Sequence, residues 1–245
     1  MPTKRLSGNK ESEVFEPNFL TSKSSRKGEL LANLKLLHED LSALSQDPMS
    51  RPKGLPGTAA QIVSDRIMGN ADKEVRLLAA CCLVDILRVF APEAPYDDAE
   101  LVNVFALLIA QIRGFATHDS TTSTGQKIFY IINSLSVVKS CVVVVFLAQS
   151  GLPGADELYV SLFNAIIQSA RAEHSEDVLA HMAGILQACI EESDVIDQDV
   201  LDALLQPLLP ANKIENPTAY NLCFSVIRRT VGSLQGPISK LPFHL

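Results

Sequence analysis

The chain contains no tryptophan, and only 6% of its 245 residues are aromatic, although 47% are hydrophobic. Leucine, alanine, valine and isoleucine must therefore fill most of the core. A β-sandwich would normally use more aromatic side chains and regular glycine or asparagine turns. This balance instead predicts interdigitated helices, and the chain is long enough to bury a sizeable core.

The sequence also lacks the cysteine spacing of a disulfide framework or of a zinc site. Neighbours such as Cys81 and Cys82 would project about 100° apart on a helix, which does not favour a disulfide. An odd number of thiols in apolar surroundings is typical of buried cysteines in a reducing compartment. The cysteines are Cys81, Cys82, Cys141, Cys189 and Cys223.

No long apolar run is present. The longest unbroken ones, such as Cys141 to Ala148, are far too short to span a bilayer. The N-terminus is polar and does not resemble a signal peptide. The sequence therefore predicts no association with a membrane.

Motifs for catalysis, cofactors or metals are missing as well. His174 and His181 could share a helix face, but a zinc site needs at least three ligands, and solvated surface histidines are the expected alternative. A Gly-x-Ser-x-Gly elbow is absent, and Gln126 interrupts the only stretch similar to a phosphate loop. We therefore expect no enzyme activity, metal, cofactor or small-molecule substrate.

The net charge of -7 is unevenly distributed. The first 28 residues contain six basic and three acidic side chains, whereas the rest of the chain is strongly acidic. Because an acidic body repels phosphate, direct binding of DNA in a groove is not expected. We interpret residues 1–28 as a largely disordered basic tail, which could pack through Val14, Phe15, Phe19 and Leu20.

Hydrophobic periodicity predicts helices along most of the remaining chain. Leucines recurring between Leu30 and Leu44 indicate the first, and the β-branched run Val142 to Val145 is interpreted as a buried helix because no second strand could pair with it. The other helices are expected at about residues 58–68, 73–91, 97–115, 126–139, 155–172, 175–193, 199–209 and 216–234.

The helix pairs repeat at roughly 40 residues, which is the spacing of HEAT-type solenoids. The predicted fold is therefore all-α, a HEAT/armadillo-like α-solenoid of stacked antiparallel helix pairs over residues 29–235. Residues 236–245 lack a capping repeat and are interpreted as an irregular tail, from a truncation or a misread exon boundary.

The stretch from Ala71 to Tyr96 is the most informative part of the chain. Its helix is apolar on most sides, so neighbours must cover it on more than one face. Two prolines then stiffen the following turn, and the carboxylate of Glu93 could bind a basic side chain. Alternatively, the prolines only end the helix, since proline is common just after a helix C-terminus. The candidate partner-binding residues are Ala91, Pro92, Glu93, Ala94, Pro95 and Tyr96.

This stretch resembles the N-terminal region of the cohesin regulators called the precocious dissociation of sisters family. Members carry an acidic helix start, a Leu-Leu-Ala-x-Cys-Cys-Leu core, an aspartate near the helix end, and Ala-Pro-Asp-Ala-Pro-Tyr. The corresponding residues here are Lys73 to Arg76, Leu77 to Leu83, Asp85 and Ala91 to Tyr96. Glu93 stands where the family more often has aspartate.

The resemblance implies a non-catalytic scaffold in the nucleus that regulates sister-chromatid cohesion and reaches chromatin indirectly. Its partners would be the cohesin complex, the release factor Wings apart-like, and sororin or other proteins with Tyr-Ser-Arg-type motifs, which would dock on the turn. The kleisin subunit of cohesin would bind largely to later repeats, beyond this chain. The alternative is a helical-repeat adaptor in another nuclear or cytoplasmic complex.

Overall fold

The computed structural model describes residues 15, 20, 27–118 and 120–234. Within these residues every regular element is a helix, as the sequence predicts. The α-helices are α1 (Lys27–Ala43), α2 (Leu55–Ile62), α3 (Asp65–Met68), α4 (Lys73–Phe90), α5 (Asp98–Arg113), α6 (Ser123–Val138), α7 (Val143–Gln149), α8 (Ala155–Ser169), α9 (Glu176–Glu192), α10 (Gln198–Leu205), α11 (Asn212–Glu215) and α12 (Pro217–Arg229). Short 3-10 turns join several of them: η2 (Pro48–Ser50), η3 (Gly114–Thr117), η4 (Ser140–Val142) and η5 (Gln206–Leu208).

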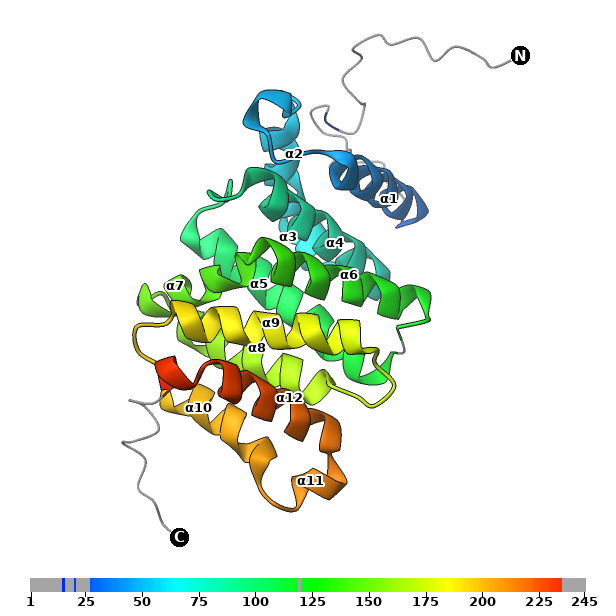
Figure 1. Cartoon of the computed structure of the whole chain (residues 1–245). Coiled ribbons are helices and arrows are strands. Elements are labelled where there is room, and N and C mark those ends of the chain that lie inside the picture. The colour runs from blue at the N-terminus through cyan, green and yellow to red at the C-terminus, as the bar shows by residue number, and fades with distance from the viewer. Residues whose placement is uncertain (1–14, 16–19, 21–26, 119, 235–245) are drawn as a thin grey trace, which may run out of the picture.

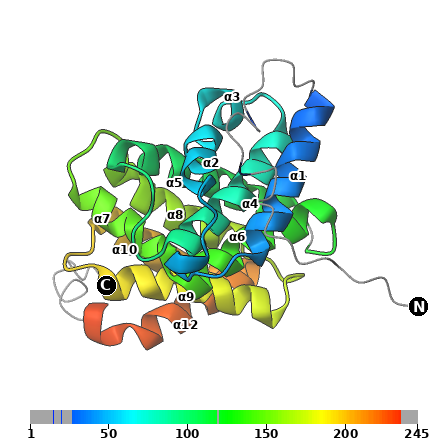
Figure 2. The same ribbon diagram turned by 90° about the horizontal axis from the view of Figure 1, so that it is seen from above.

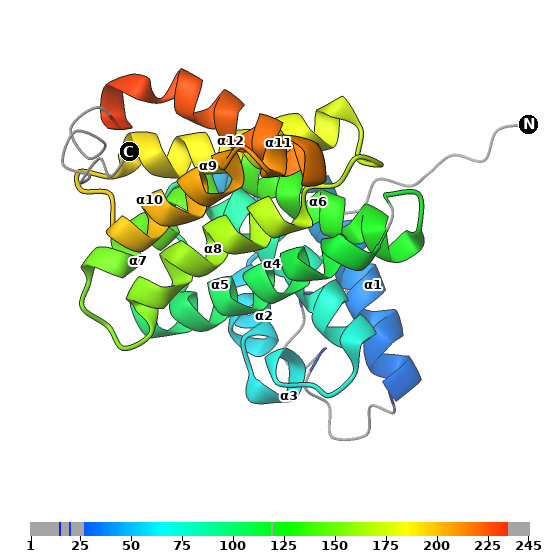
Figure 3. The same cartoon turned by 90° about the horizontal axis from the view of Figure 1, so that it is seen from below.

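The long helices form two stacked layers (Figure 1). One layer runs through α4, α6, α9 and α12, and α1 packs along α4 at its edge (Figure 2). The second layer runs through α5, α8 and α10, and Figure 3 shows the two rows side by side. Each helix packs against the next helix of its own layer, which is the organisation of a solenoid. The predicted HEAT-like fold is therefore confirmed.

Side-chain caps place several helix starts where the sequence predicts them. The carboxylate of Asp72 accepts hydrogen bonds from the backbone N–H groups of Glu74 and Val75 at 2.9 and 3.2 Å. Asn216 caps α12 in the same way through the N–H of Ala219. Such caps satisfy N–H groups that have no partner within the helix, so they fix where it begins.

The segment around residues 50–68 differs from the prediction of a loop to Gly57 followed by one helix. Helix α2 already begins at Leu55, with Pro56 in its first turn, where a missing N–H group costs nothing. The chain then leaves the helical path at Ser64 before α3 begins. The last predicted helix is also shorter than expected, because α12 ends at Arg229.

The β-branched run at Val142 to Val145 is helical, as predicted. It forms η4 and the start of α7, and the side chains of Val144 and Val145 are buried. Tertiary burial therefore overrides the strand propensity of four consecutive valines.

Two residues before α1 pack on the helical body. Phe15 and Leu20 are buried, and the N–H of Leu20 donates to the side-chain oxygen of Gln61 at 3.0 Å. Gly54 allows this arrangement, because a Cβ atom there would collide with the backbone of Phe15. Lys27 and Gly28, which were also predicted to belong to the tail, instead begin α1. The other residues predicted for the basic tail, and the predicted irregular tail at 236–245, lie outside the described residues.

The segment Asp98–Thr117 is long and apolar enough to cross a membrane by length and composition, which the search for unbroken apolar runs did not anticipate. In the fold it packs against α8, α4 and α6. Buried side chains such as Val104, Leu108 and Ile112 belong to the common core. Its apolar character is thus used in packing between repeats.

Candidate docking turn after helix α4

Helix α4 supplies the rigid base of the candidate site. Its buried residues run from Val75 to Val89 and cover almost the whole circumference of the helix. Helices α1, α5 and α6 pack around it, which explains why one amphipathic stripe could not describe the sequence. A helix so enclosed holds its last turn in a fixed place relative to the rest of the fold.

A polar cluster joins three helices beside this last turn. Asp85 of α4 is completely buried and accepts a hydrogen bond from the hydroxyl of Tyr130 on α6 at 2.6 Å. The ring nitrogen Nδ1 of His38 on α1 lies 2.9 Å from the same carboxylate. Arg88 contributes a longer contact of 3.4 Å. The buried charge is therefore surrounded by donors, as burial of a carboxylate requires.

Arg88 extends this cluster to the end of α1. Its guanidinium donates to the backbone carbonyl oxygens of Leu41 and Leu44 at 2.8 and 2.7 Å. These carbonyls lie at the C-terminal end of α1, where intrahelical donors run out, and the carbonyl of Leu41 also accepts from the N–H of Leu44 at 3.1 Å. A cationic side chain therefore stabilises that helix terminus. One residue of α4 thus ties α1 to the point where the candidate turn begins.

The turn itself is fixed at both ends. The N–H of Ala91 donates to the carbonyl of Arg88 at 3.4 Å, and the peptide bond between Ala91 and Pro92 is cis. The N–H of Glu93 donates to the carbonyl of Phe90 at 3.2 Å. On the other side Asp97 and Glu100 form a reciprocal capping box that starts α5. Little conformational entropy remains to be lost when a partner binds.

The structure exposes some of the six candidate residues and buries another. Pro92 and Glu93 are exposed, whereas Ala91, Ala94 and Pro95 are partly covered. Tyr96 is only 8% exposed and belongs to the core, which corrects the expectation that it offers its ring and hydroxyl at the surface. Burial raises the pKa of Tyr96 well above its ordinary value of 10.0. Tyr96 thus anchors the turn from below.

The surface of the turn is acidic. Glu93, Asp97 and Asp98 are exposed, and Glu100 is partly exposed. Within the described residues Glu93 forms no ion pair, whereas Asp97 and Glu100 are engaged in the capping box. The free carboxylate of Glu93 can therefore accept charge-assisted hydrogen bonds from an incoming lysine or arginine.

Sequence reasoning did not find the polar cluster or the positions of the histidines. His38 contacts the buried Asp85. His174 is buried, and its ring is stacked on that of Phe115 with 4.2 Å between the ring centroids. Neither is a solvated surface histidine, which was the expected alternative to metal binding. A single aspartate within the apolar face of α4 was the one signal in the sequence that could have indicated the cluster.

The described residues contain no group of three or more side chains suited to a metal ion. All five cysteines are buried and free. Burial, with a smaller effect of Asp85, raises the pKa of Cys81 to about 12, and burial alone does the same for Cys223. Thiols in this state are poor nucleophiles, since the thiolate is the reactive form.

Comparison with known proteins places this geometry in a family. The family model described as sister chromatid cohesion protein PDS5 matches residues 28–241. The chain is 30% identical over 210 residues to "Sister chromatid cohesion protein PDS5 homolog B-A" of Xenopus laevis, which covers 85% of this chain and 14% of that protein. It is 29% identical over 212 residues to PDS5 homolog A of Homo sapiens, covering 86% and 15%.

Among solved structures, a chain in the structure of the Pds5-Scc1 complex is similar to this fold. The TM-score is 0.78 at 26% sequence identity, and the likeness covers 92% of this chain and 34% of that chain. The chain spans about 15% of the length of the curated relatives it matches. By the extent of the family match, the chain belongs to the PDS5 family of sister chromatid cohesion proteins.

Proposed function

We propose that this chain is a non-catalytic scaffold that regulates sister-chromatid cohesion by binding cohesin and the factors that release or protect it. The observation that carries the proposal is the turn after α4, a stiff and exposed acidic element on a fully enclosed helix. Membership of the PDS5 family gives the process, since its relatives are named for sister chromatid cohesion. The chain would then act in the nucleus, bound to chromatin through its partners.

The turn is the proposed docking surface for a basic-aromatic peptide. Pro92 and Pro95 offer preformed apolar edges that need no ordering on binding. The carboxylate of Glu93 would accept the guanidinium of a Tyr-Ser-Arg-type motif, of the kind expected in Wings apart-like and sororin. The longer side chain of glutamate keeps the charge that aspartate supplies in the family pattern.

Binding to cohesin is the second part of the proposal. The similar chain of known structure was solved in complex with Scc1. Since the present chain corresponds to about a third of that one, we propose the turn as its own contribution and the kleisin contact as a property of later repeats. Membership of the PDS5 family favours this assignment over an adaptor in an unrelated complex.

Calorimetric titration with a Tyr-Ser-Arg peptide tests the turn. Glu93→Lys replaces the proposed acceptor by a positive charge, which would repel the arginine of the peptide. Pro95→Ser removes one apolar edge of the turn and its stiffness. We expect each variant to weaken binding by at least about ten-fold, because charged anchors and rigid contacts dominate small interfaces. Glu157→Lys, at an exposed position in the first turn of α8, is the matched charge-reversal control and should bind like the parent chain. Unchanged affinity in both turn variants would refute the assignment.

A further inference from the structure

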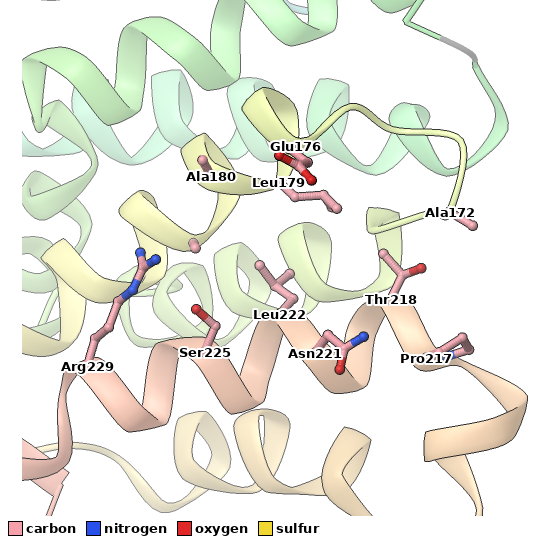
Figure 4. A pocket seen from close by; sticks show the side chains of 11 residues that line it. Ala172, Glu176, Leu179, Ala180, Pro217, Thr218, Asn221, Leu222, Ser225 and Arg229 are labelled. Carbon is pink, nitrogen blue, oxygen red and sulfur yellow. The ribbon is translucent and has the colours of Figure 1, made fainter.

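A second surface feature lies far along the chain from the turn. Helices α9 and α12 are neighbours in one layer, and between them runs a groove of about 530 Å³ (Figure 4). Its walls come from Leu179, Ala180 and Ala183 on α9 and from Asn221, Leu222 and Ser225 on α12. Most of its exposed lining is apolar.

The groove exists because small side chains face each other across the two helices. Ala180 lies opposite Ser225 in Figure 4, and Ala183 lines the same groove. Below them Ala183 and Leu222 are buried and form a floor continuous with the core. The depression is thus built into the packing of two regular helices, and it needs no movement to receive a ligand.

Two side chains of opposite charge line the groove. Glu176 lies in the first turn of α9, above Leu222 in Figure 4, and Arg229 is the last residue of α12, at one end of the groove. Both side chains are exposed, and neither forms an ion pair or hydrogen bond within the described part of the chain. The nearby Arg171 and Glu173 bind each other at 3.2 Å and leave Glu176 available.

The length between these charges limits the ligand. Leu222 lies below Glu176 in Figure 4. From Leu222 to Arg229 helix α12 rises by about 10 Å, at 1.5 Å per residue. An extended peptide covers that distance with about three residues, at roughly 3.3 Å each. The charged residues of a ligand would therefore flank a short apolar centre.

We propose that the α9–α12 groove binds an extended segment of a partner protein, with a lysine or arginine beside Glu176, an aspartate or glutamate beside Arg229, and small apolar residues between them over the buried floor. Electrostatic complementarity sets the direction of the segment, and the apolar floor supplies the contact area. This surface is separate from the turn after α4 and does not depend on the function proposed for that turn.

Selection of a phage-displayed library of random dodecapeptides on the full 245-residue chain tests the proposal. Selected peptides should share a basic residue and an acidic residue about three positions apart, with apolar residues between. In fluorescence polarisation, Ala180→Trp and Asn221→Trp should each weaken the best peptide by at least about ten-fold, since they fill the groove from opposite walls. Ala106→Trp, at an exposed site of α5, and Glu93→Lys should leave its affinity unchanged.

Reversing both charges sharpens the test. The double variant Glu176→Lys, Arg229→Glu should select peptides with the acidic and basic residues in exchanged order. Failure to enrich any such peptide, or enriched peptides that bind both blocked variants normally, would overturn the proposal. If sedimentation shows a dimer that Ala180→Trp abolishes, the groove binds a second copy of the chain. If peptides bind only after residues 235–245 are removed, the groove binds the chain's own end. Either result would also overturn the proposal.

Discussion

The buried carboxylate of Asp85 offers the sharpest test of how α4 is held. Its partners come from α1, α4 and α6, and the shortest contact is the 2.6 Å hydrogen bond from Tyr130. The perturbations are Asp85→Asn, which removes the charge at nearly constant volume, Tyr130→Phe, which removes the hydroxyl, and the double variant. Together they form a cycle that isolates the energy of this one contact.

The structure sets the expected magnitudes. A hydrogen bond to a charged group contributes about 1.5–3 kcal/mol, and Tyr130 is only half-buried, so we expect Tyr130→Phe to lower the free energy of unfolding by about 1.5 kcal/mol. Removing one member of a buried ion pair costs about 3–5 kcal/mol. Because the side chains of His38 and Arg88 remain 23% and 22% exposed, water can solvate them, and Asp85→Asn should cost about 2–3 kcal/mol.

Urea unfolding followed by circular dichroism at 222 nm gives these free energies by linear extrapolation. The coupling energy between the two substitutions should be about 1–1.5 kcal/mol. The matched control is Tyr220→Phe, since Tyr220 is also half-buried on a helix but its hydroxyl forms no hydrogen bond within the described residues. That variant should change stability by less than about 0.5 kcal/mol. A coupling energy near zero would refute the role of the cluster.

Three further outcomes follow from the burial of polar groups. Tyr96→Phe should leave the free energy of unfolding unchanged or raise it by about 1 kcal/mol in urea titrations, because the buried hydroxyl has no hydrogen-bond partner within the described residues; a clear loss would contradict this. At pH 8, iodoacetamide should alkylate Cys81 and Cys223 roughly a thousand-fold more slowly in the native chain than in urea, as mass spectrometry can measure; equal rates would contradict their raised pKa values. Burial raises the pKa of both Tyr130 and Tyr159 above 10.0, and for Tyr130 the hydrogen bond to Asp85 adds to this effect. The stability that the two hydroxyls contribute is therefore complete below pH 10 and is lost as the pH rises toward the folded-state pKa. Thermal unfolding temperatures should therefore fall as the pH rises from 10 to 12, and less steeply in Tyr130→Phe.

Local chemistry allowed much of the fold to be predicted from the sequence. Asp72 and Asp97 carry side chains that cap helix N-termini, and both helices begin there. The valine run was predicted correctly by asking where its backbone hydrogen bonds would go, since an isolated strand could not satisfy them. Helix rhythm then indicated the solenoid, although the spacing between repeats was irregular.

The features that escaped prediction depend on contacts between distant segments. The cluster at Asp85 joins residues 38, 85, 88 and 130, and periodicity in one helix cannot show which polar groups of another helix will meet it. Tyr96 was expected to offer its ring and hydroxyl at the surface because tyrosine is enriched at binding hot spots, but it is buried in the core. The groove between α9 and α12 likewise appears only when Ala180 and Ser225 face each other.

Quantitative affinity purification from nuclear extract tests the central claim most directly. The full chain and its Glu93→Lys variant are used as baits, and captured proteins are compared by mass spectrometry with isotope labelling. The account predicts that cohesin subunits or their release and protection factors are enriched with the parent chain, and that the variant loses most of this enrichment. Capture of an unrelated complex alone, or equal capture by the two baits, would contradict it.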